Sequence, residues 1–362
     1  MTAHSPADRS PPSLHTRPDF YVTVVAGIEE VAASELSLLG AGALSTRPGK
    51  AFFSFKQDSG PLLDLRSVMY LYAFIAEHTG CPPDRSAQLW FEDAARTLDL
   101  SPALAHHAAL HGPTENPSFR ITAARSGHHQ YTSPEIAAWV GSGVQAQTSW
   151  PVDLEGYDYD IEAELVGDRA LFGLRLSARW KDRRPKPVYH PASLNPTVAY
   201  AMVSLLGLDP ADVFLDPACG GGTLLLERAA LAPSRLILGG DIWPTSLDYA
   251  TQTLAAAGVR ASLARWDARH LPLAPASIDR VASNLPFGHR ISHGPIVRNF
   301  YRRLLPELAR VLRPGGRAAL LTSRRRWLGR ALADDPDLRP DRRMRIILGG
   351  KEAYIFLLSR LP

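Results

Sequence analysis

The spacing of apolar residues near the start of the chain predicts a small domain that mixes strands and helices. Residues 21–25 form a β-rich run, and residues 28–39 carry apolar side chains at helical spacing. Residues 51–55 predict a second strand, and residues 62–75 predict a second helix. This order of elements predicts an α+β domain over residues 19–80.

The next region, residues 81–180, predicts a second α+β domain. Residues 118–122 are strand-like, and Ser133 followed by Pro134 is typical of a helix start with Ser133 as the N-cap. Residues 160–176 contain two alternating apolar runs around a Gly-Asp turn, which predict a β-hairpin.

From about residue 195 onward, short apolar strands alternate with helical stretches, as in a doubly wound parallel sheet. Strands are expected at 213–215, 236–238, 280–282 and 318–322, and helices at 223–232, 246–257 and 298–312. Two final apolar runs flank a Gly-Gly-Lys turn, so the last strand is expected to be antiparallel. The sequence therefore predicts an α/β domain over residues 191–362.

Composition excludes several classes of protein. Hydrophobic residues make up 45% of the chain, but no apolar stretch approaches the roughly 18 residues of a membrane span. Residues 1–18 are rich in Ser and Pro and lack the apolar segment of a signal peptide, so we expect a disordered tail and a cytoplasmic protein. Cys81 and Cys219 are the only cysteines, which excludes a disulfide framework and a cysteine-based zinc site.

The charge of the chain leans basic, with 40 Lys and Arg against 36 Asp and Glu, and arginine dominates the basic set. Arginine favours bidentate contacts with phosphate, so the excess fits a polyanionic partner. A GC-rich genome, which favours arginine codons, explains the bias equally well. Residues 181–190 combine basic residues with prolines, which predicts a stiff basic linker or simply a solvated connector.

A glycine-rich turn follows the strand expected at 213–215. It reads Asp216-Pro-Ala-Cys-Gly-Gly-Gly-Thr223 and leads directly into an expected helix. Glycines let the backbone approach a ligand at the carboxyl edge of the sheet, and the N–H groups at the helix start favour a carboxylate or phosphate. The spacing differs from the dinucleotide fingerprint and lacks a P-loop lysine. An ordinary left-handed turn is the alternative.

Two further carboxylates follow the next two strands. Asp241 stands about 20 residues beyond the glycines, where an acidic side chain can accept hydrogen bonds from ribose hydroxyls. Asp267 follows what reads as a third strand and could accept from an adenine amino group. The alternative for Asp267 is that it caps a turn.

A fourth strand end carries Asn284-Leu-Pro-Phe-Gly288. The nitrogen of a planar amine delocalises its lone pair into the ring and is a poor nucleophile. The side-chain oxygen of Asn284 and the backbone carbonyl of Leu285 can accept its two hydrogens and draw that lone pair out of the ring plane. Pro286 stiffens the turn, and Phe287 can stack on the ring. A chance sequence is the alternative, and the series of matching strand ends argues against it.

Together these motifs resemble those of class I S-adenosylmethionine-dependent amino-methyltransferases, and more narrowly the THUMP-domain guanosine N2-methyltransferases of RNA. Residues 190–199 are similar to the segment before the catalytic domain of that family, and residues 119–133 are similar to a THUMP strand, loop and helix. The resemblance implies a Rossmann-like methyltransferase domain at 191–362. It also implies a ferredoxin-like domain at 19–80 and a THUMP-like RNA-binding domain at 81–180.

The resemblance further implies S-adenosylmethionine as the methyl donor and RNA, with tRNA favoured, as the partner. It implies catalytic roles for Asn284, Leu285, Pro286 and Phe287. The implied cofactor-binding residues are Asp216, Ala218, Cys219, Gly220, Gly222, Thr223, Asp241, Ile242, Asp267, Ala268 and Asn284. No metal or covalent intermediate is implied, the histidines have no ligand-like spacing, and we expect a monomer.

The preferred hypothesis is methylation of guanosine N2 in tRNA, in the acceptor-stem region. The alternatives are guanine N2 in rRNA or another small RNA, adenine N6, a protein glutamine, or a non-catalytic RNA-binding adaptor. The chain departs from the family at Gly221, where serine is usual, and at Leu285, where proline is common. The arginines within 324–326 and 342–345 are hypothesised to join the basic linker in an RNA-facing surface, or to form a solvated face.

Overall fold

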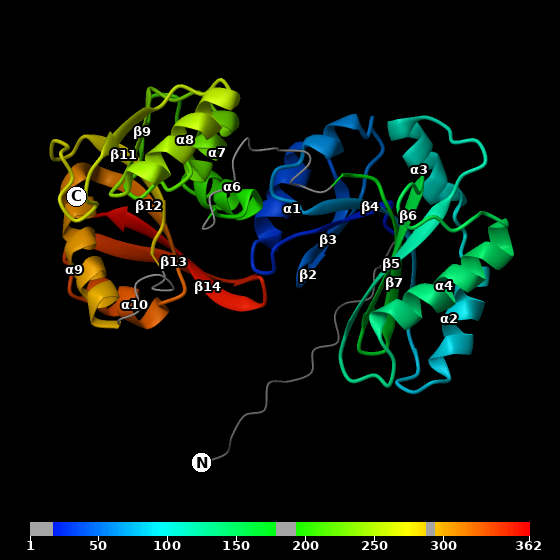
Figure 1. Cartoon of the computed structure of the whole chain (residues 1–362). Helices are drawn as coiled ribbons and strands as arrows, with labels where there is room; N and C mark the ends of the chain where they lie inside the picture. Colours follow the sequence, from blue (N-terminus) through cyan, green and yellow to red (C-terminus); the bar gives the residue numbers. More distant parts are fainter. Residues whose placement is uncertain (1–16, 179–192, 287–293) are drawn as a thin grey trace, which may run out of the picture. The chain divides into compact units, whose positions relative to one another are not determined.

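The structure is a computed structural model that describes residues 17–178, 193–286 and 294–362, without the side chains of the first two residues of the last range. The predicted linker at 181–190 and nearly all of the predicted tail lie outside the described residues. The chain forms two compact units, which are described separately below (Figure 1).

The first unit is built on one seven-stranded sheet with the strand order β2-β3-β1-β4-β7-β6-β5. Its strands are β1 (Phe20–Thr23), β2 (Gly42–Arg47), β3 (Lys50–Ser54), β4 (Tyr70–His78), β5 (Phe119–Ser126), β6 (Tyr159–Val166) and β7 (Arg169–Arg175). Strands β5 and β6 are parallel, and the other neighbours are antiparallel. Strands from residues 19–80 and from residues 81–180 therefore share one sheet, joined where β4 pairs with β7.

The prediction of a helix over residues 62–75 is wrong. A short 3-10 helix, η1 (Gly60–Asp64), is followed by strand β4, which lies between β1 and β7 and is buried on both faces in its first part. A strand buried on both faces carries a continuous apolar run, and periodicity alone cannot separate such a run from a buried helix.

Three helices belong wholly to this unit: α2 (Ala87–Arg96), α3 (Ser101–His111) and α4 (Ser133–Thr148). Helix α4 starts one residue earlier than expected, because Thr132 rather than Ser133 is the N-cap. The backbone of Thr132 is extended, and its hydroxyl accepts from the N–H of Glu135 while the Glu135 carboxylate accepts from the Thr132 N–H. This reciprocal capping box satisfies two donors at the helix start.

Two short N-terminal segments, residues 24–35 and 66–69, group with the second unit rather than the first. Helix α1 (Glu29–Leu38) begins in the first of these segments. The N–H of Ile347 donates to the carbonyl of Ala26 over 2.9 Å, so this segment adds to the edge of the second unit at strand β13.

The second unit contains a seven-stranded sheet with the order β10-β9-β8-β11-β12-β14-β13. Its strands are β8 (Val213–Asp216), β9 (Leu236–Asp241), β10 (Ser262–Arg265), β11 (Ile278–Asn284), β12 (Leu312–Thr322), β13 (Leu338–Leu348) and β14 (Lys351–Arg360). The first five strands in this order are parallel, and β14 lies antiparallel between β12 and β13. The predicted parallel sheet with an antiparallel last strand is confirmed.

Helices α7 and α8 cover one face of this sheet, and α9 and α10 cover the other (Figure 1). The helices of the unit are α6 (Pro196–Ser204), α7 (Thr223–Leu231), α8 (Pro244–Ala256), α9 (Gly294–Val311) and α10 (Arg325–Ala333). The sequence analysis predicted α7, α8 and α9 but not α6 or α10. No helix in the described ranges is long and apolar enough to cross a membrane.

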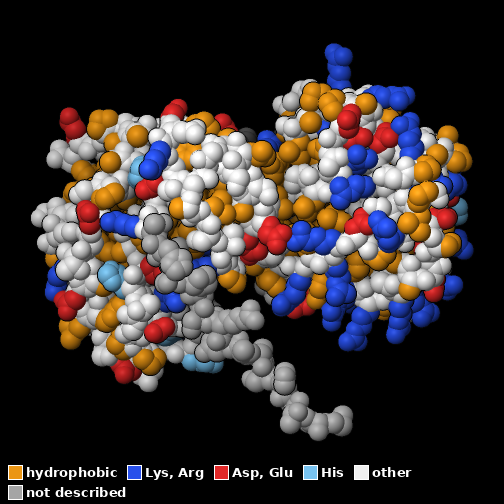
Figure 2. Space-filling view, turned by 180° about the vertical axis from the view of Figure 1, so that it is seen from behind, with side chains coloured by type: hydrophobic (Ala, Val, Ile, Leu, Met, Phe, Trp, Pro, Cys, Tyr) orange, Lys and Arg blue, Asp and Glu red, His pale blue; other side chains and the backbone are white. Residues whose placement is uncertain are grey.

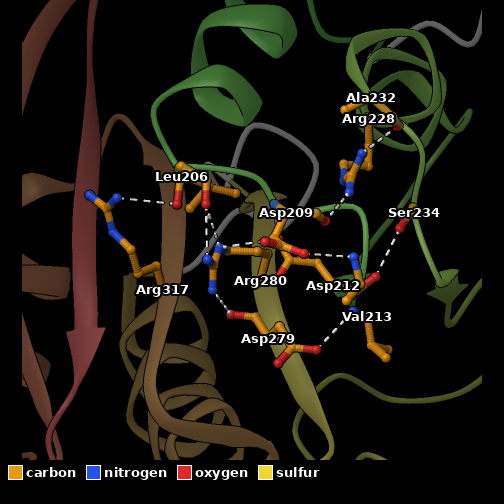
Figure 3. A network of polar contacts seen from close by, with 12 residues as sticks. Leu206, Asp209, Asp212, Val213, Arg228, Ala232, Ser234, Asp279, Arg280 and Arg317 are labelled. Carbon is orange, nitrogen blue, oxygen red and sulfur yellow. Dashed lines mark hydrogen bonds and ion pairs between the residues drawn. The ribbon is translucent and has the colours of Figure 1, made fainter.

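Polar contacts hold the amino ends of the strands together (Figure 3). Arg228 of α7 is fully buried and donates to the backbone carbonyls of Ala232 and Asp209, at 2.7 and 3.2 Å. Arg280 at the start of β11 pairs with Asp212, just before β8, at 3.4 Å. These contacts stabilise the edge of the sheet opposite to the candidate site.

Candidate active site

The predicted site residues meet at one edge of the second sheet. Strands β8, β9, β10 and β11 are parallel neighbours, so their carboxyl ends lie side by side. Asp216 ends β8, Asp241 ends β9, Asp267 follows β10 and Asn284 ends β11. This edge is the place where doubly wound sheets bind ligands.

The glycine-rich turn after β8 is held against the end of β9. The N–H of Cys219 donates to the carbonyl of Gly240 over 2.8 Å. Gly220 and Gly222 have φ angles of +50° and +77°, which only glycine adopts without strain. A Cβ added to Gly220 would meet no atom within 4 Å, so the backbone is open there, whereas Gly222 packs closely against α8 and starts α7.

Asp241 connects the turn to its own strand end. Its carboxylate accepts from the N–H of Gly220 and from the N–H of Trp243, both at 3.0 Å. A carboxylate offers about four lone-pair positions, so two acceptor positions remain for a ligand. Next to Asp241, the side chains of Ile242 and Trp243 are 46% and 67% exposed, which leaves apolar surface at the same edge.

Asp216 is almost completely buried beneath the turn. Its carboxylate accepts from the hydroxyl of Ser283 at 2.9 Å and from the N–H of Ala218 at 3.2 Å. Burial raises the pKa of Asp216 to about 7, and the nearby charge of Asp241 acts in the same direction, while the two hydrogen bonds oppose the shift. Burial also raises the pKa of Cys219, so this thiol stays protonated and unreactive.

Asp267 is engaged by a neighbour in its own turn. Arg269 contacts both carboxylate oxygens of Asp267, with Arg269 Nη2 at 2.6 Å from Oδ2, and its hydrogen bonds lower the pKa of Asp267. The carboxylate therefore stays ionised and also accepts from the Arg269 N–H at 3.0 Å. This contact with the backbone two residues on is the turn-capping role, whereas contact with adenine remains a prediction; Ala268 beside Asp267 is buried.

Asn284 has an unused acceptor. Its side-chain oxygen is buried and has no hydrogen-bond partner among the described residues. A buried acceptor without a partner costs about 1–3 kcal/mol, and most such groups in native proteins are satisfied. The end of β11 is therefore arranged to receive a donor from outside the described chain.

The backbone after Asn284 is held by the neighbouring strand and helix. Leu285 N–H donates to the carbonyl of Leu321 in β12 over 3.0 Å. The hydroxyl of Tyr301, from α9, contacts the Pro286 carbonyl at 3.3 Å and the Thr322 hydroxyl at 2.8 Å. The fourth predicted catalytic residue, Phe287, lies outside the described residues.

The sequence analysis gave no role to three residues that organise this site: Ser283, Tyr301 and Thr322. Ser283 precedes Asn284, and Thr322 ends the neighbouring strand, so the positions of these two residues at strand ends could have indicated that they belong to the site. Tyr301 occupies the buried face of an amphipathic helix, and a tyrosine at such a position generally needs a hydrogen-bond partner. That partner is visible only in three dimensions.

The residues at this edge fit S-adenosylmethionine. An open glycine backbone and the start of α7 suit the amino-acid end, Asp241 suits hydroxyl donors, and Ile242 offers an apolar surface. Within the described ranges, no group of three or more His, Cys, Asp or Glu side chains is placed to hold a metal ion.

A parallel sheet with one antiparallel strand inserted near its edge, and a glycine turn after the first strand, define a class I methyltransferase. Residues 183–353 match the family described as "RMKL-like, methyltransferase domain", and residues 103–175 match the THUMP domain.

Known proteins resemble nearly the whole chain. The tRNA (guanine(6)-N2)-methyltransferase of Thermus thermophilus is 32% identical, over 92% of this chain and 97% of the relative. The crystal structure of TrmN from Thermus thermophilus superposes with a TM-score of 0.77 at 31% identity, covering 94% of this chain and 99% of that one. The U6 snRNA (guanine-N(2))-methyltransferase THUMPD2 of Bos taurus is 33% identical over 58% of this chain and 41% of its own length.

The chain belongs to the THUMP-domain guanine N2-methyltransferases, which use S-adenosylmethionine. The family, fold class and cofactor predicted from the sequence motifs are confirmed.

Proposed function

We propose that this protein transfers the methyl group of S-adenosylmethionine to the exocyclic N2 of a guanosine in the acceptor-stem region of tRNA. The observation that carries the proposal is the buried side-chain oxygen of Asn284. It has no partner among the described residues and lies at the strand end next to the glycine turn. Such an acceptor can receive a hydrogen bond from an amino group.

The chain's own residues would prepare the amine and hold the donor. The Asn284 oxygen and the Leu285 carbonyl accept the two N2 hydrogens, which makes the nitrogen lone pair available outside the ring plane. Pro286 keeps these two acceptors in position, and Phe287 supports the guanine ring. Positioning of this kind contributes roughly 7–11 kcal/mol to lowering a barrier.

The cofactor would lie along the edge formed by β8, β9 and β10. The turn from Asp216 to Thr223, including Ala218 and Cys219, binds the methionine portion through its backbone, and Asp241 accepts from the ribose hydroxyls. Ile242, Asp267 and Ala268 surround the adenine. When bound, S-adenosylmethionine would supply an electrophilic methyl group: the sulfur–methyl bond would break as the bond from methyl to N2 forms. A neutral thioether would be the leaving group, and N2 would release one proton to solvent.

The choice of tRNA as substrate rests on two observations. The relative that covers 92% of this chain is named for guanine 6 of tRNA, and a THUMP domain matches residues 103–175. A relative named for U6 snRNA keeps another small RNA as the second candidate substrate. Under this proposal the THUMP-like domain at 81–180, together with the ferredoxin-like domain at 19–80, binds the RNA, and domain 191–362 performs the transfer. The protein acts as a monomer in the cytoplasm.

The test is methyl transfer from tritiated S-adenosylmethionine to unmodified bulk tRNA, followed by nucleoside analysis. We expect N2-methylguanosine as the labelled product, and mapping of the modified nucleotide identifies the position. Unmodified U6 RNA and rRNA serve as parallel substrates. Methyladenosine as the product, or labelling of U6 RNA or rRNA in preference to tRNA, would overturn the proposal, and so would the absence of any labelled RNA.

A further inference from the structure

The exposed face of α9 carries arginines without carboxylate partners. Arg298, Arg302 and Arg303 are exposed, while Val297 and Tyr301 on the opposite face are buried. Residues 296–306 contain no Asp or Glu. Arg298 and Arg302 are four residues apart, and like charges at this spacing destabilise a helix. Helix stability therefore does not explain this arrangement.

Helix α10 repeats the pattern beside α9. Arg326 and Arg330 are exposed and again four residues apart. Arg326 lies in the first turn, where the helix dipole disfavours a cation. Leu328 of α10 and Leu304 of α9 belong to the same buried core, so the two helices are packed together. In the part of the chain that the structure describes, the α9–α10 arginines form no side-chain ion pair or hydrogen bond; they are Arg298, Arg302, Arg303, Arg326 and Arg330.

Three of the four arginines of β13 are paired with carboxylates, although the sequence analysis grouped the arginines of 342–345 with those of 324–326. Arg342 pairs with Glu30 at 2.6 Å, in the N-terminal segment that belongs to the same unit. Arg345 pairs with Glu352 at 2.6 Å, and Arg339 pairs with Asp341 at 3.2 Å. Their charges are already balanced by carboxylates, so they attract a polyanion less strongly.

The α9–α10 arginines belong to helices that contact Pro286 and Thr322, next to the end of β11. Tyr301 of α9 contacts the Pro286 carbonyl, and the N–H of Arg324, just before α10, donates to Thr322 over 2.8 Å. Figure 2 shows Lys and Arg side chains gathered along the lower side of this unit, where Figure 1 draws both α10 and the hairpin of β13 and β14. The two hydrogen bonds place both helices beside the strand end that carries Asn284, which pairs with Leu321 of β12.

We propose that the α9–α10 arginines bind the phosphate backbone of the substrate RNA on either side of the modified nucleotide. The proposal rests on RNA being the substrate, as proposed above. The new element is that the methyltransferase unit itself binds the RNA. It does so through unpaired arginines on two helices and not through the paired arginines of β13. Arginine is suited to this contact because its planar group binds phosphate with two hydrogen bonds.

The experiment compares two triple variants of the full-length chain that remove the same charge. The test variant is Arg302→Gln, Arg326→Gln and Arg330→Gln, and the matched control is Arg339→Gln, Arg342→Gln and Arg345→Gln. Fluorescence anisotropy measures binding of labelled, unmodified tRNA over a series of KCl concentrations. The slope of log K against log salt reports the number of phosphate contacts, at about 0.7–0.9 for each contact.

We expect the test variant to lose about 2–3 units of slope and the control less than about 1 unit. Binding of S-adenosylhomocysteine, measured by calorimetry, should be unchanged in both, which shows that the site is folded. An unchanged slope in the test variant, or an equal loss in the control, would overturn the proposal. If the test variant binds phosphatidylserine vesicles less tightly than the wild type but binds tRNA equally well, the arginines face a membrane, and the proposal is also overturned.

The product assay distinguishes this inference from the proposed function. If the wild-type protein methylates tRNA guanosine and the test variant keeps the wild-type salt dependence of tRNA binding, the proposed function stands and the proposed role of the α9–α10 arginines is refuted. A wild-type protein that binds tRNA through these arginines but yields no N2-methylguanosine would refute the function alone.

Discussion

The hydroxyl of Ser283 donates a hydrogen bond to the buried carboxylate of Asp216 over 2.9 Å. Ser283 directly precedes Asn284 in β11, and Asp216 begins the glycine turn after β8. Because β8 and β11 are parallel neighbours, this single bond joins the strand that ends at Asn284 to the glycine-rich turn. The hydrogen bond therefore fixes the position of the end of β11 relative to the glycine turn.

Replacement of Asn284 by alanine should abolish turnover while cofactor binding persists. The variant removes the acceptor that draws out the N2 lone pair, and loss of one such preorganised group typically lowers kcat by about 100-fold or more. Single-turnover methyl transfer and calorimetry with S-adenosylhomocysteine measure the two properties. Gln252→Ala, which removes a side-chain amide from the exposed face of α8, is the control. Loss of cofactor binding in the Asn284 variant would show that the role assigned to it is wrong.

Replacement of Asp241 by alanine should have the opposite effect. It removes the acceptor for the N–H groups of Gly220 and Trp243 and the expected ribose contact, so affinity for S-adenosylhomocysteine should fall by about 10- to 100-fold. Binding of tRNA should stay unchanged. The control Asp248→Ala removes the same charge from an exposed position on α8. Normal cofactor affinity in the Asp241 variant would contradict this assignment.

Tyr301→Phe should slow the chemical step without weakening cofactor binding. The hydroxyl bridges the Pro286 carbonyl and Thr322, and burial raises the pKa of Tyr301 to about 12, so it remains a neutral donor at ordinary pH. Loss of this buried bridge should cost about 1–2 kcal/mol of stability. A decrease in kcat of several-fold at unchanged KM for S-adenosylmethionine identifies a positioning role. Thr322→Val should behave alike, and normal kcat in both variants would contradict the idea.

Gly240→Ala should destabilise the second unit severely. A Cβ at this position would lie 2.0 Å from the ring of Trp266, whose indole N–H is fixed to the Pro217 carbonyl at 3.0 Å and cannot easily move away. Overpacking of this kind typically costs about 1–3 kcal/mol, and the close approach to a fixed ring favours the upper end of that range. Thermal unfolding measures the change. Gly329→Ala on α10 meets no atom within 4 Å and should be neutral or stabilising; equal unfolding temperatures in the two variants would argue against the close packing.

Asp216→Asn should change how stability depends on pH. The pKa of Asp216 is raised from the ordinary 3.8 to about 7 in the folded protein, so folding favours its protonated form. Its stabilising contribution is complete below the unfolded pKa and is lost as the pH rises through the folded pKa. From about pH 5 to about pH 8 the wild-type unfolding temperature should therefore fall relative to that of the asparagine variant. Asp248→Asn is the exposed control, and parallel pH profiles for wild type and Asp216→Asn would refute this.

The sequence analysis failed where contacts, rather than local patterns, decide the structure. Strand β4 was interpreted as a helix because its apolar run comes from burial between β1 and β7. The hypothesis for the arginines treated those of β13 and those near α10 as one set. The structure pairs Arg342 with Glu30, which is 312 positions earlier in the chain, and no periodicity in either segment indicates such a partner.

The sequence by itself determined the class of the protein, the alternation of strands and helices from β8 to β12 in the second unit, and the residues that stand at the strand ends. These properties are local: glycines in a turn, an acidic residue after a strand and Asn-Leu-Pro each act through their own backbone and side chain. Only the tertiary structure decided that Ser283 contacts Asp216, that Tyr301 holds Pro286 and which arginines remain without carboxylates. Each of those relationships joins residues that are distant in the chain, and they become neighbours only when the sheet and its helices have packed.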